Sequence, residues 1–206
     1  MPDKPKRTYT MRRSFTIFLA ALLLVAGCGQ KEKLFNGKDL DGWVCVTAEP
    51  SGDTFGVQDG VLHVTGTPMG YIRTEKKYSD FTLRLEWRWG ASRVDSGIFV
   101  FLQEGDNVWP TGVQLQLRES DFGYFFSGLA LEGVDGPFYR KAPLCDGDPE
   151  RPDGEWNQVE IVCRGGHITA TVNGVLVNEA VCEASDGYIG LQSEGGAIEF
   201  RNIIVE

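Results

Sequence analysis

The sequence predicts an all-β protein, built as a β-sandwich or jelly roll, on three observations. Beyond the N-terminal segment, apolar and polar residues alternate with a period of two, as in strands with one buried face. The 206 residues include 26 glycines, which suit the many tight turns of such a fold. No stretch after the first 27 residues shows a convincing helical period. Roughly a dozen short strands at this spacing are typical of two packed sheets.

Two Asx-Gly pairs predict β-hairpins. Asp59-Gly60 separates TFGVQ from VLHVT, and Asn173-Gly174 separates ITATV from VLVNEA. Both dipeptides accept the positive φ angles that two-residue hairpin turns require. The segment 187–206 predicts two further strands, joined at residues 194–196.

Two central segments predict strands with one buried and one outward face. In FTLRLEWRW (81–89) the odd-numbered residues are apolar, and in GVQLQLR (112–118) Val113, Leu115 and Leu117 are apolar. Because side chains alternate along a strand, the polar residues between them point away from the core. The outward residues are Thr82, Arg84, Glu86 and Arg88 in the first segment and Gln114, Gln116 and Arg118 in the second.

The segment SGIFVFLQ (96–103) predicts a strand that is apolar on both faces. Simple alternation places Ile98, Val100 and Leu102 on one side. It places Phe99 and Phe101 together on the other side, where they could stack on a sugar ring or pack beneath a loop.

The least regular segment runs from residue 119 to 155 and includes the acidic stretch CDGDPERPDGE. Long loops on a sandwich often carry binding sites. For the acidic stretch, a solvated connection is the simpler interpretation. In DGEWNQVEIVCRGGHITATVNG (153–174), Trp156 is expected to wedge into the edge of the sandwich ahead of a strand meander, so this motif predicts architecture and not catalysis.

The N-terminus predicts a bacterial lipoprotein signal. Five Lys/Arg residues precede an apolar run of 13 residues (14–26), too short to span a bilayer comfortably. The run leads into Val25-Ala26-Gly27 and then Cys28, the cysteine that lipoprotein processing acylates. We therefore expect residues 1–27 to be a signal peptide, 28–33 a short lipidated tether and 34–206 the sandwich domain. The expected location is the cell envelope, lipid-anchored at the outer membrane or facing the periplasm; an ordinary secretory signal with an incidental cysteine is the alternative.

The charge balance argues against nucleic acid as a partner. Residues 1–27 hold five of the 20 basic and one of the 29 acidic residues, which leaves 15 basic and 28 acidic residues in the rest. A surface this acidic repels phosphate backbones. We therefore expect membrane contact through the N-terminal lipid only.

Four cysteines follow the signal, and their spacing is not that of a zinc site. They are Cys45, Cys145, Cys163 and Cys182. They form no C-x-x-C pair, and the two histidines are His63 and His167. We expect no metal site, and we expect several of these cysteines to be small buried apolar residues. Three disulfide connectivities remain open.

Seven segments occur in a characteristic order over residues 33–206. They are KLFNGKDLDGW (33–43), VQDGVLHV (57–64), YSDFTLRLEWRW (78–89), DSGIFVF (95–101), GVQLQL (112–117), DGEWNQVEIVCRGGHITATVNG (153–174) and GYIGLQSEGGAIEFRNIIV (187–205). As an ordered set they resemble the lectin-like sandwich domain family named for 3-keto-disaccharide hydrolysis. The resemblance implies a two-sheet antiparallel β-sandwich of the concanavalin A-like jelly-roll type and a carbohydrate ligand.

The resemblance also implies a reaction. The substrate is a glycoside whose C3 hydroxyl has been oxidised to a ketone, which makes the C2 proton acidic. A base removes that proton, the group on C1 departs, and water added to the enone completes net hydrolysis. The site needs a base near C2 and a positive or hydrogen-bonding group at the enolate oxygen. No cofactor is otherwise required, and a divalent metal could fill the second role.

Candidate residues follow from the predicted outward faces and the final turn. Glu194 and Glu86 are the candidates for the base. The candidates for substrate binding are Gln114, Gln116, Arg84, Arg88, Phe99, Phe101, Tyr139 and Gln192. The simpler interpretation of Arg84, Glu86 and Arg88 is a set of cross-strand charge pairs on a solvated sheet.

Three positions depart from the pattern that the resemblance implies. Gln114 stands where an acidic residue is expected, Ser193 and Glu194 stand where Asp-His is expected, and Phe101 stands where an arginine is expected. A neutral amide does not accept a proton as a carboxylate does. Three functions therefore remain open: an exported hydrolase or lyase acting on 3-keto-glycosides, a non-catalytic lectin-like module that keeps the sugar platform, and a purely structural envelope protein.

Overall fold

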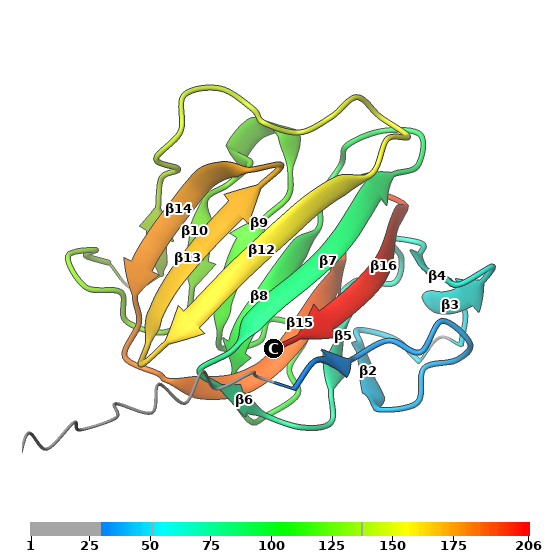
Figure 1. Cartoon of the computed structure of the whole chain (residues 1–206). Helices are drawn as coiled ribbons and strands as arrows, with labels where there is room; N and C mark the ends of the chain where they lie inside the picture. Colours follow the sequence, from blue (N-terminus) through cyan, green and yellow to red (C-terminus); the bar gives the residue numbers. More distant parts are fainter. Residues whose placement is uncertain (1–29, 51, 137) are drawn as a thin grey trace, which may run out of the picture.

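The computed structural model describes residues 30–50, 52–136 and 138–206, and within these ranges the chain forms two antiparallel β-sheets packed face to face (Figure 1). Sheet A consists of β1 (Glu32–Lys33), β3 (Phe55–Gln58), β4 (Val61–Val64), β7 (Thr82–Trp89), β12 (Asn157–Arg164), β13 (His167–Val172), β14 (Val175–Val181) and β16 (Ile198–Val205). Sheet B consists of β2 (Trp43–Thr47), β5 (Gly70–Thr74), β6 (Tyr78–Ser79), β8 (Gly97–Leu102), β9 (Val113–Gln116), β10 (Phe125–Ser127), β11 (Tyr139–Lys141) and β15 (Asp186–Ser193). The predicted two-sheet antiparallel sandwich is confirmed.

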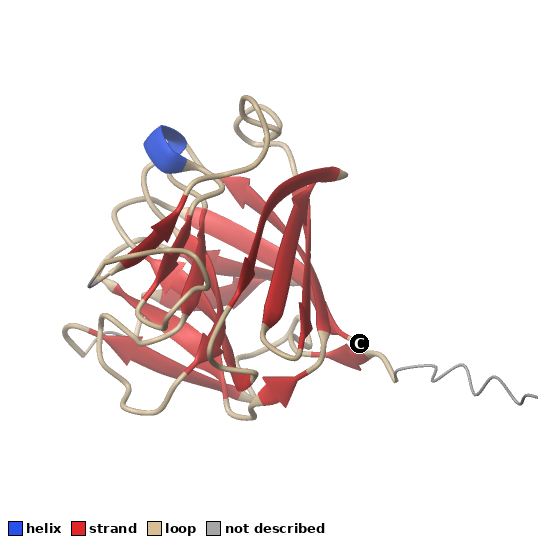
Figure 2. Ribbon diagram, turned by 90° about the vertical axis from the view of Figure 1, so that its left-hand side faces the viewer, coloured by secondary structure: helices blue, strands red, loops and turns tan. Residues whose placement is uncertain are grey.

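The strand order brings distant segments of the chain side by side. Sheet A has the order β14-β13-β12-β7-β16-β4-β3, with β1 paired to β16. Sheet B has the order β11-β10-β9-β8-β15-β5-β2, with β6 paired to β15. A short 3-10 helix, η1 (Glu119–Asp121), lies among the loops at one end of the two layers (Figure 2). The chain passes from one sheet to the other repeatedly, and β8 and β15, which are far apart in the sequence, become neighbours in sheet B.

Both predicted hairpins form where the Asx-Gly pairs stand. Asp59 and Gly60 have φ angles of 52° and 78°, and they join β3 to β4. Asn173 and Gly174 have φ angles of 49° and 85°, and they join β13 to β14. These positive angles are the reason that such turns select Asn, Asp and Gly.

The core lies between the sheets and follows the predicted alternation of β7. Leu83, Leu85, Trp87 and Trp89 are all buried, whereas Arg84 is exposed between them. The inward residues of β12, β13 and β16 pack against the same cluster. Burying one such large apolar side chain stabilises a fold by about 1.5–3 kcal/mol.

The alternation predicted for β8 fails at Phe101. Phe101 has a φ of 53°, and the pairing of β8 with β15 shifts register between Tyr188 and Gly190. This bulge turns Phe101 into the core, where its ring lies edge-on to Phe81 at 6.0 Å, while Phe99 stays on the outer face. A Cβ on Gly187 would lie 2.5 Å from the Phe101 backbone, so glycine permits the close approach. The prediction that Phe99 and Phe101 share a sugar platform is therefore wrong.

A buried carboxylate ties the acidic loop to the end of β7. The side chain of Glu150 is 0% exposed, and its Oε1 accepts hydrogen bonds from the indole Nε1 of Trp87 at 3.2 Å and of Trp89 at 3.0 Å. Arg93 Nη1 donates to Glu150 Oε2 at 3.2 Å. The interpretation of this loop as a purely solvated connection is wrong for Glu150, because two core tryptophans need an acceptor there.

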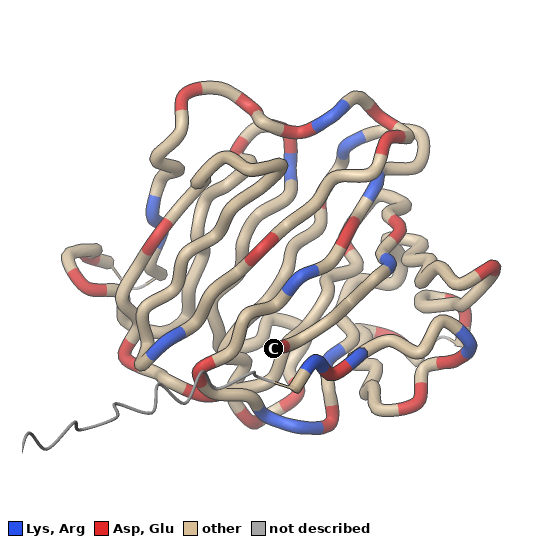
Figure 3. The backbone as a smooth tube through the Cα atoms, in the orientation of Figure 1, with Lys and Arg blue, Asp and Glu red and all other residues tan. Residues whose placement is uncertain are grey.

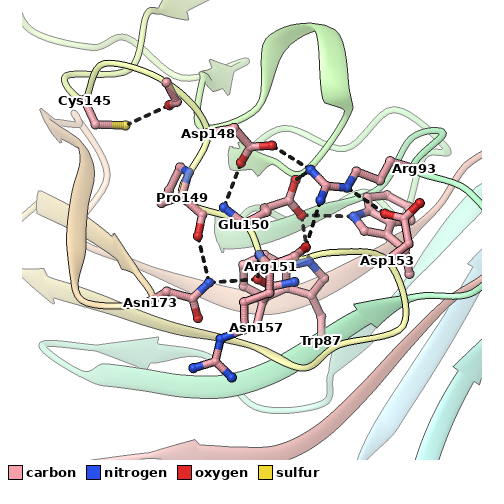
Figure 4. Close-up of polar contacts among 12 residues, drawn as sticks. Trp87, Arg93, Cys145, Asp148, Pro149, Glu150, Arg151, Asp153, Asn157 and Asn173 are labelled. Atoms are coloured by element: carbon pink, nitrogen blue, oxygen red, sulfur yellow. Dashed lines mark hydrogen bonds and ion pairs between the residues drawn. The ribbon is translucent and has the colours of Figure 1, made fainter.

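Arg93 extends this anchor to other parts of the loop. Figure 4 shows its guanidinium among the acidic side chains, donating to Asp148 Oδ2 at 2.6 Å and to Asp153 Oδ1 at 2.8 Å. Burial raises the pKa of Glu150 to about 7, and the Asp148 carboxylate adds to this rise. The hydrogen bonds from Trp89 and Trp87 and the charge of Arg93 oppose it. The cost of burying this charge therefore exceeds the stabilisation that its partners supply.

Trp156 lies half-buried directly before β12, against two arginine side chains. The guanidinium groups of Arg88 and Arg201 lie 4.6 and 3.9 Å from the centre of its ring. Next to it, the buried Asn157 accepts hydrogen bonds from Arg151 N at 2.7 Å and Asn173 Nδ2 at 2.8 Å. These contacts fix the start of β12.

The four cysteines of the sandwich are free thiols: Cys163 and Cys182 are buried, Cys145 is half-buried and Cys45 is exposed. The expected signal peptide and Cys28 lie outside the described residues, so the lipid anchor stays a prediction. Within the part of the chain that the structure describes, no helix is long and apolar enough to cross a membrane.

Candidate functional site

A pocket of about 320 Å³ lies on the outer face of sheet B. Its floor comes from β8, β9, β10 and β15, because the residues between their core side chains point outward. Loop residues complete the wall, and the volume is in the range typical of small-ligand sites. The lining residues are Asp95, Phe99, Trp109, Pro110, Thr111, Gly112, Gln114, Gln116, Arg118, Phe126, Gly128, Phe138, Gln192 and Glu194.

Three glutamines connect two carboxylates across the floor. Gln114 Nε2 donates to Gln116 Oε1 at 2.5 Å and to Gln192 Oε1 at 2.8 Å. Gln116 Nε2 donates to Asp95 Oδ1 at 2.8 Å, and Gln192 Nε2 donates to Glu194 Oε2 at 2.7 Å. A carboxylate at position 114 could not donate the first two bonds. The amide at this position therefore fits its neighbours.

Gly97 makes room for this network. It lies in β8, beside the strand that carries Gln114. A Cβ on Gly97 would lie 2.3 Å from Gln114 Nε2, too close for any side chain without displacing the amide. The glycine of the Asp-Ser-Gly segment is thus explained by the position of Gln114.

An arginine and two carboxylates form the charged side of the pocket. Arg118 Nη1 donates to Asp95 Oδ2 at 3.1 Å, and Arg118 is held from behind by Asp121, which accepts from Nε at 2.8 Å. Isolated backbone bridges join Asp95 to Glu194 and Gly195, which brings the two carboxylates close together. This side of the pocket therefore combines one guanidinium with two acids.

Both pocket carboxyl groups have a raised pKa. Burial is the largest cause for Glu194, the nearby Asp95 carboxylate adds to it, and Arg118 opposes it. Burial also raises the pKa of Asp95, against the opposing charge of Arg118 and the hydrogen bond from Gln116. A half-buried carboxylate with a raised pKa is a stronger base than a solvated one.

Aromatic side chains form the opposite wall. Trp109 is 65% exposed and Phe138 is 60% exposed. The rings of Phe126 and Phe138 lie 6.1 Å apart, and Arg140 covers Phe126 from 5.0 Å. Exposed aromatic rings beside polar groups are typical of sites for ligands with one apolar and one polar face.

The structure brings together five of the residues predicted from the sequence. Gln114, Gln116, Gln192, Glu194 and Phe99 all line the pocket. Four of them come from β8, β9 and β15, which are neighbours in sheet B. The fifth, Glu194, lies in the turn that follows β15.

The other predicted base lies elsewhere. Glu86 is on the outer face of sheet A, where its Oε2 accepts from Arg201 Nε at 2.5 Å. Arg84 pairs with Glu160 on the same face, with Nη2 2.7 Å from Oε2, and Arg88 pairs with Glu199. Figure 3 shows acidic and basic positions side by side along this front sheet.

The expectation that Glu86, Arg84 and Arg88 share a groove with the glutamines is therefore wrong, because β7 and β9 belong to different sheets. The cross-strand charge pairs that were the alternative are what the structure shows. His63 lies beside them, with its Nδ1 3.0 Å from Glu199 Oε1.

Tyr139 also points away from the pocket. It is half-buried in β11 and packs against the core cluster, while its neighbour Phe138 lines the pocket instead. Adjacent residues in an extended chain face opposite ways, so the prediction missed the correct aromatic residue by one position.

Sequence reasoning missed several lining residues. Arg118 was placed on the outward face but not in the site, although it continues the alternation of Gln114 and Gln116. Asp95 gave a weak signal, as an acid directly before a predicted strand. Trp109 and Phe138 lie in irregular segments where no period exists to detect them.

In the described residues, no group of three or more His, Cys, Asp or Glu side chains is arranged to hold a metal ion. The pocket itself offers two carboxylates and several amide groups. Its chemistry is that of a proton acceptor flanked by hydrogen-bond donors and a guanidinium.

The sequence matches the model of the 3-keto-alpha-glucoside-1,2-lyase-like domain over residues 30–206. The chain belongs to this family. The match spans both sheets and every residue of the pocket. A comparison with curated proteins gives no match.

Solved structures show that this lyase-like domain has a widely shared fold. A candidate glycosyl hydrolase from Parabacteroides distasonis ATCC 8503 is 22% identical, with a TM-score of 0.65 over 85% of this chain and 93% of that chain. The carbohydrate-binding module CBM66 from Bacillus subtilis is 13% identical, with a TM-score of 0.59 over 79% and 93%. The β-glucanase of Bacillus licheniformis is 11% identical, with a TM-score of 0.58 over 86% and 98%. The predicted lectin-like jelly roll is thereby confirmed, and these likenesses concern the fold alone.

Proposed function

We propose that the pocket on sheet B binds a 3-keto-α-glucoside and that Glu194 removes the proton at C2. The proposal combines membership of the 3-keto-alpha-glucoside-1,2-lyase-like family with a carboxylate of raised pKa in a sugar-sized pocket. The C3 ketone makes the C2 proton acidic enough for a carboxylate to remove. In an unoxidised glucoside the C2 proton is not acidic enough for a carboxylate to remove.

The elimination balances without an added oxidant or reductant. Glu194 takes the C2 proton, and the electron pair of that C–H bond forms the enolate. The enolate electrons then form the C1–C2 double bond as the C1–O bond breaks. The departing oxygen takes up the proton that Glu194 has accepted and leaves as an alcohol, which restores the carboxylate, and water added across the C1–C2 double bond of the enone completes hydrolysis.

Arg118 and the amides of Gln116 and Gln192, each of which donates one N–H to the network, are suited to stabilise the charge that develops on the ketone oxygen. Arg118 is held in place by Asp95 and Asp121, so its guanidinium is oriented before substrate binds. A preorganised donor at a developing oxyanion typically contributes about 2.7–4 kcal/mol to catalysis. Gln192 fixes Glu194 through the hydrogen bond to Oε2, which positions the base.

The observation that carries the proposal is the position of Glu194. It is the half-buried carboxylate at the open end of the amide network, with its pKa raised by burial and by Asp95. Asp95 is more deeply buried and is already bound by Arg118 and Gln116. Of the two pocket acids, Glu194 is therefore better placed to reach a ligand.

Turnover tests the proposal directly. The protein is expected to convert a 3-keto-α-glucoside to the enone or its hydrate. The ultraviolet absorbance of the enone and the release of the alcohol measure this turnover. In D2O, deuterium is expected at C2 of recovered substrate if proton removal is reversible. The parent α-glucoside, which lacks the ketone, serves as the control and should remain unchanged. Binding of both compounds without turnover would instead support a lectin-like module.

Trp109 offers a test of the aromatic wall. We expect Trp109→Ala to weaken binding of a 3-keto-glucoside about two- to tenfold, because a stacked aromatic ring contributes roughly 0.5–1.5 kcal/mol. The side chain is largely exposed, so the melting temperature should stay unchanged. Isothermal titration measures the affinity, and Leu176→Ala, exposed on β14 of the other sheet, is the matched control. Equal affinities for both variants would remove Trp109 from the site.

A further inference from the structure

A second hollow adjoins the pocket. It has a volume of about 600 Å³, and it shares Asp95, Arg118 and Glu194 with the first. Its other walls are Gly66, Thr67, Met69, Val94 and Gly195. Asp95, Arg118 and Glu194, the last of them the proposed base, therefore lie between two hollows that open on either side of them.

The two hollows differ in chemistry. The first is lined by amide groups that can hydrogen-bond the hydroxyl and carbonyl oxygens of a sugar. Apart from the three charged residues that it shares with the first, the second is lined by two glycines, Thr67, Met69 and Val94, of which Val94 is 39% exposed. A ring that must be held by its polar groups belongs in the first hollow. The second offers contact area and few groups that discriminate between ligands.

The second hollow is preformed. Gly195 N donates to Gly66 O at 2.8 Å, and Ser193 Oγ donates to Pro68 O at 3.1 Å. A Cβ on Gly66 would lie 2.5 Å from Gly196 N, so only glycine allows the two segments to approach this closely. These contacts hold the segment 66–69 against the turn that carries Glu194.

We propose that the hollow formed by Gly66, Thr67, Met69 and Val94 binds the leaving group of the glycoside. This inference rests on the proposed function. With the 3-keto ring over the glutamines, the C1–O bond lies at the boundary beside Glu194, and the departing alcohol lies in the second hollow. Because the wall away from the charged boundary offers Met69, Val94 and glycine backbone, the hollow accepts a second sugar ring by its C–H face, or an aryl or alkyl group, with little discrimination.

Two substrates that share the 3-keto-glucosyl group separate this inference from the proposed function. One is a 3-keto-disaccharide, and the other is methyl 3-keto-α-glucoside, whose leaving group is too small to fill the second hollow. Thr67→Trp and Val94→Trp narrow that hollow from two sides, and both side chains are exposed. Leu176→Trp is the matched control, since Leu176 is 45% exposed on the edge of sheet A.

We expect Thr67→Trp and Val94→Trp to raise KM for the disaccharide at least tenfold and to leave KM for the methyl glycoside within twofold. Leu176→Trp should change neither value, and melting temperatures confirm that each variant is folded. If both substrates are affected equally, or if neither is, the leaving group does not occupy this hollow. If the unmodified protein turns over neither substrate, the proposed function fails and the inference fails with it.

Discussion

Glu150→Ala is expected to lower the free energy of unfolding by about 3 kcal/mol at pH 6. The substitution leaves the indole N–H groups of Trp87 and Trp89 without an acceptor in the core, and each such group costs about 1–3 kcal/mol. It also opens a cavity where the side chain was fully buried. Urea denaturation measures the change as a shift of the midpoint at constant slope.

Glu150→Gln is the matched control, because its side-chain oxygen can still accept from both indoles. The folded-state pKa of Glu150 is about 7, above the ordinary value of about 4.3 in an unfolded chain. Between these values the folded protein holds a proton that the unfolded chain releases. The stability contribution is thus complete below pH 4.3 and is lost as the pH rises through 7, a change of about 3–4 kcal/mol.

The glutamine variant has no proton to lose at this position, so its stability should depend less steeply on pH than that of the unmodified protein. The two proteins are expected to diverge between pH 4.3 and 7, with the variant gaining in relative stability. Parallel curves across this interval would show that Glu150 does not titrate there. An alanine variant as stable as the glutamine variant would show that the indole hydrogen bonds contribute nothing.

Alternation along the chain identified which side chains face outward, but it carries no information on which sheet a strand joins. Glu86 and Gln114 were both correctly placed on outer faces. Because β7 pairs with β12 and β16, Glu86 faces away from the pocket on the opposite side of the sandwich. Strand pairing is a long-range property, and a local period cannot determine it.

The sequence also did not predict the β-bulge at Phe101, where β8 holds one extra residue. The segment that contains Phe99 and Phe101 is apolar at every position, so nothing local marks the bulge that turns Phe101 inward. The signal lies instead in the partner strand, at Gly187, whose missing side chain admits the Phe101 backbone. Bulges of this kind redirect all side chains beyond them.

Pocket residues that lie in or next to regular strands could be predicted from the sequence, and those in irregular loops could not. The glutamines of β9 were found because they alternate with core residues, and Gln192 and Glu194 because they adjoin the predicted final turn, whereas Trp109 and Phe138 lie in loops that only the folded sheet positions. Glu150 shows the same limit for acidic loops. Asp148 and Arg151 nearby in the sequence are charged and exposed. Glu150 is buried instead because the indole groups of Trp87 and Trp89 in β7 bind its carboxylate.

The largest functional effect is expected for Glu194→Gln. The variant should lower kcat for a 3-keto-α-glucoside by a factor of 100 or more, because a general base typically contributes 10²–10⁴-fold. The amide can still hydrogen-bond Gln192, so the network and the melting temperature should change little. KM should also change little, since the shape of the pocket is kept. A loss of kcat alone separates a missing base from a damaged binding site.

The dependence of kcat/KM on pH gives an independent test of Glu194 as the base. The base acts when deprotonated, so kcat/KM of the unmodified protein should fall as the pH decreases through the raised pKa of Glu194. This fall should occur at a higher pH than about 4.3, the value of an ordinary glutamate. Asp95 is coupled to Glu194, and the profile therefore reports the pair.

Glu86→Gln is the control that the structure provides for this experiment. It makes the same chemical change, but on the outer face of sheet A, in an ion pair with Arg201. The pair is half-buried and lies on the sheet that does not carry the pocket, so turnover should equal that of the unmodified protein once the melting temperature shows that the variant is folded. Equal turnover by Glu194→Gln and Glu86→Gln would show that neither carboxylate is the base. In that case another group in the pocket would act as the base; only binding without turnover by the unmodified protein would favour the non-catalytic lectin-like function.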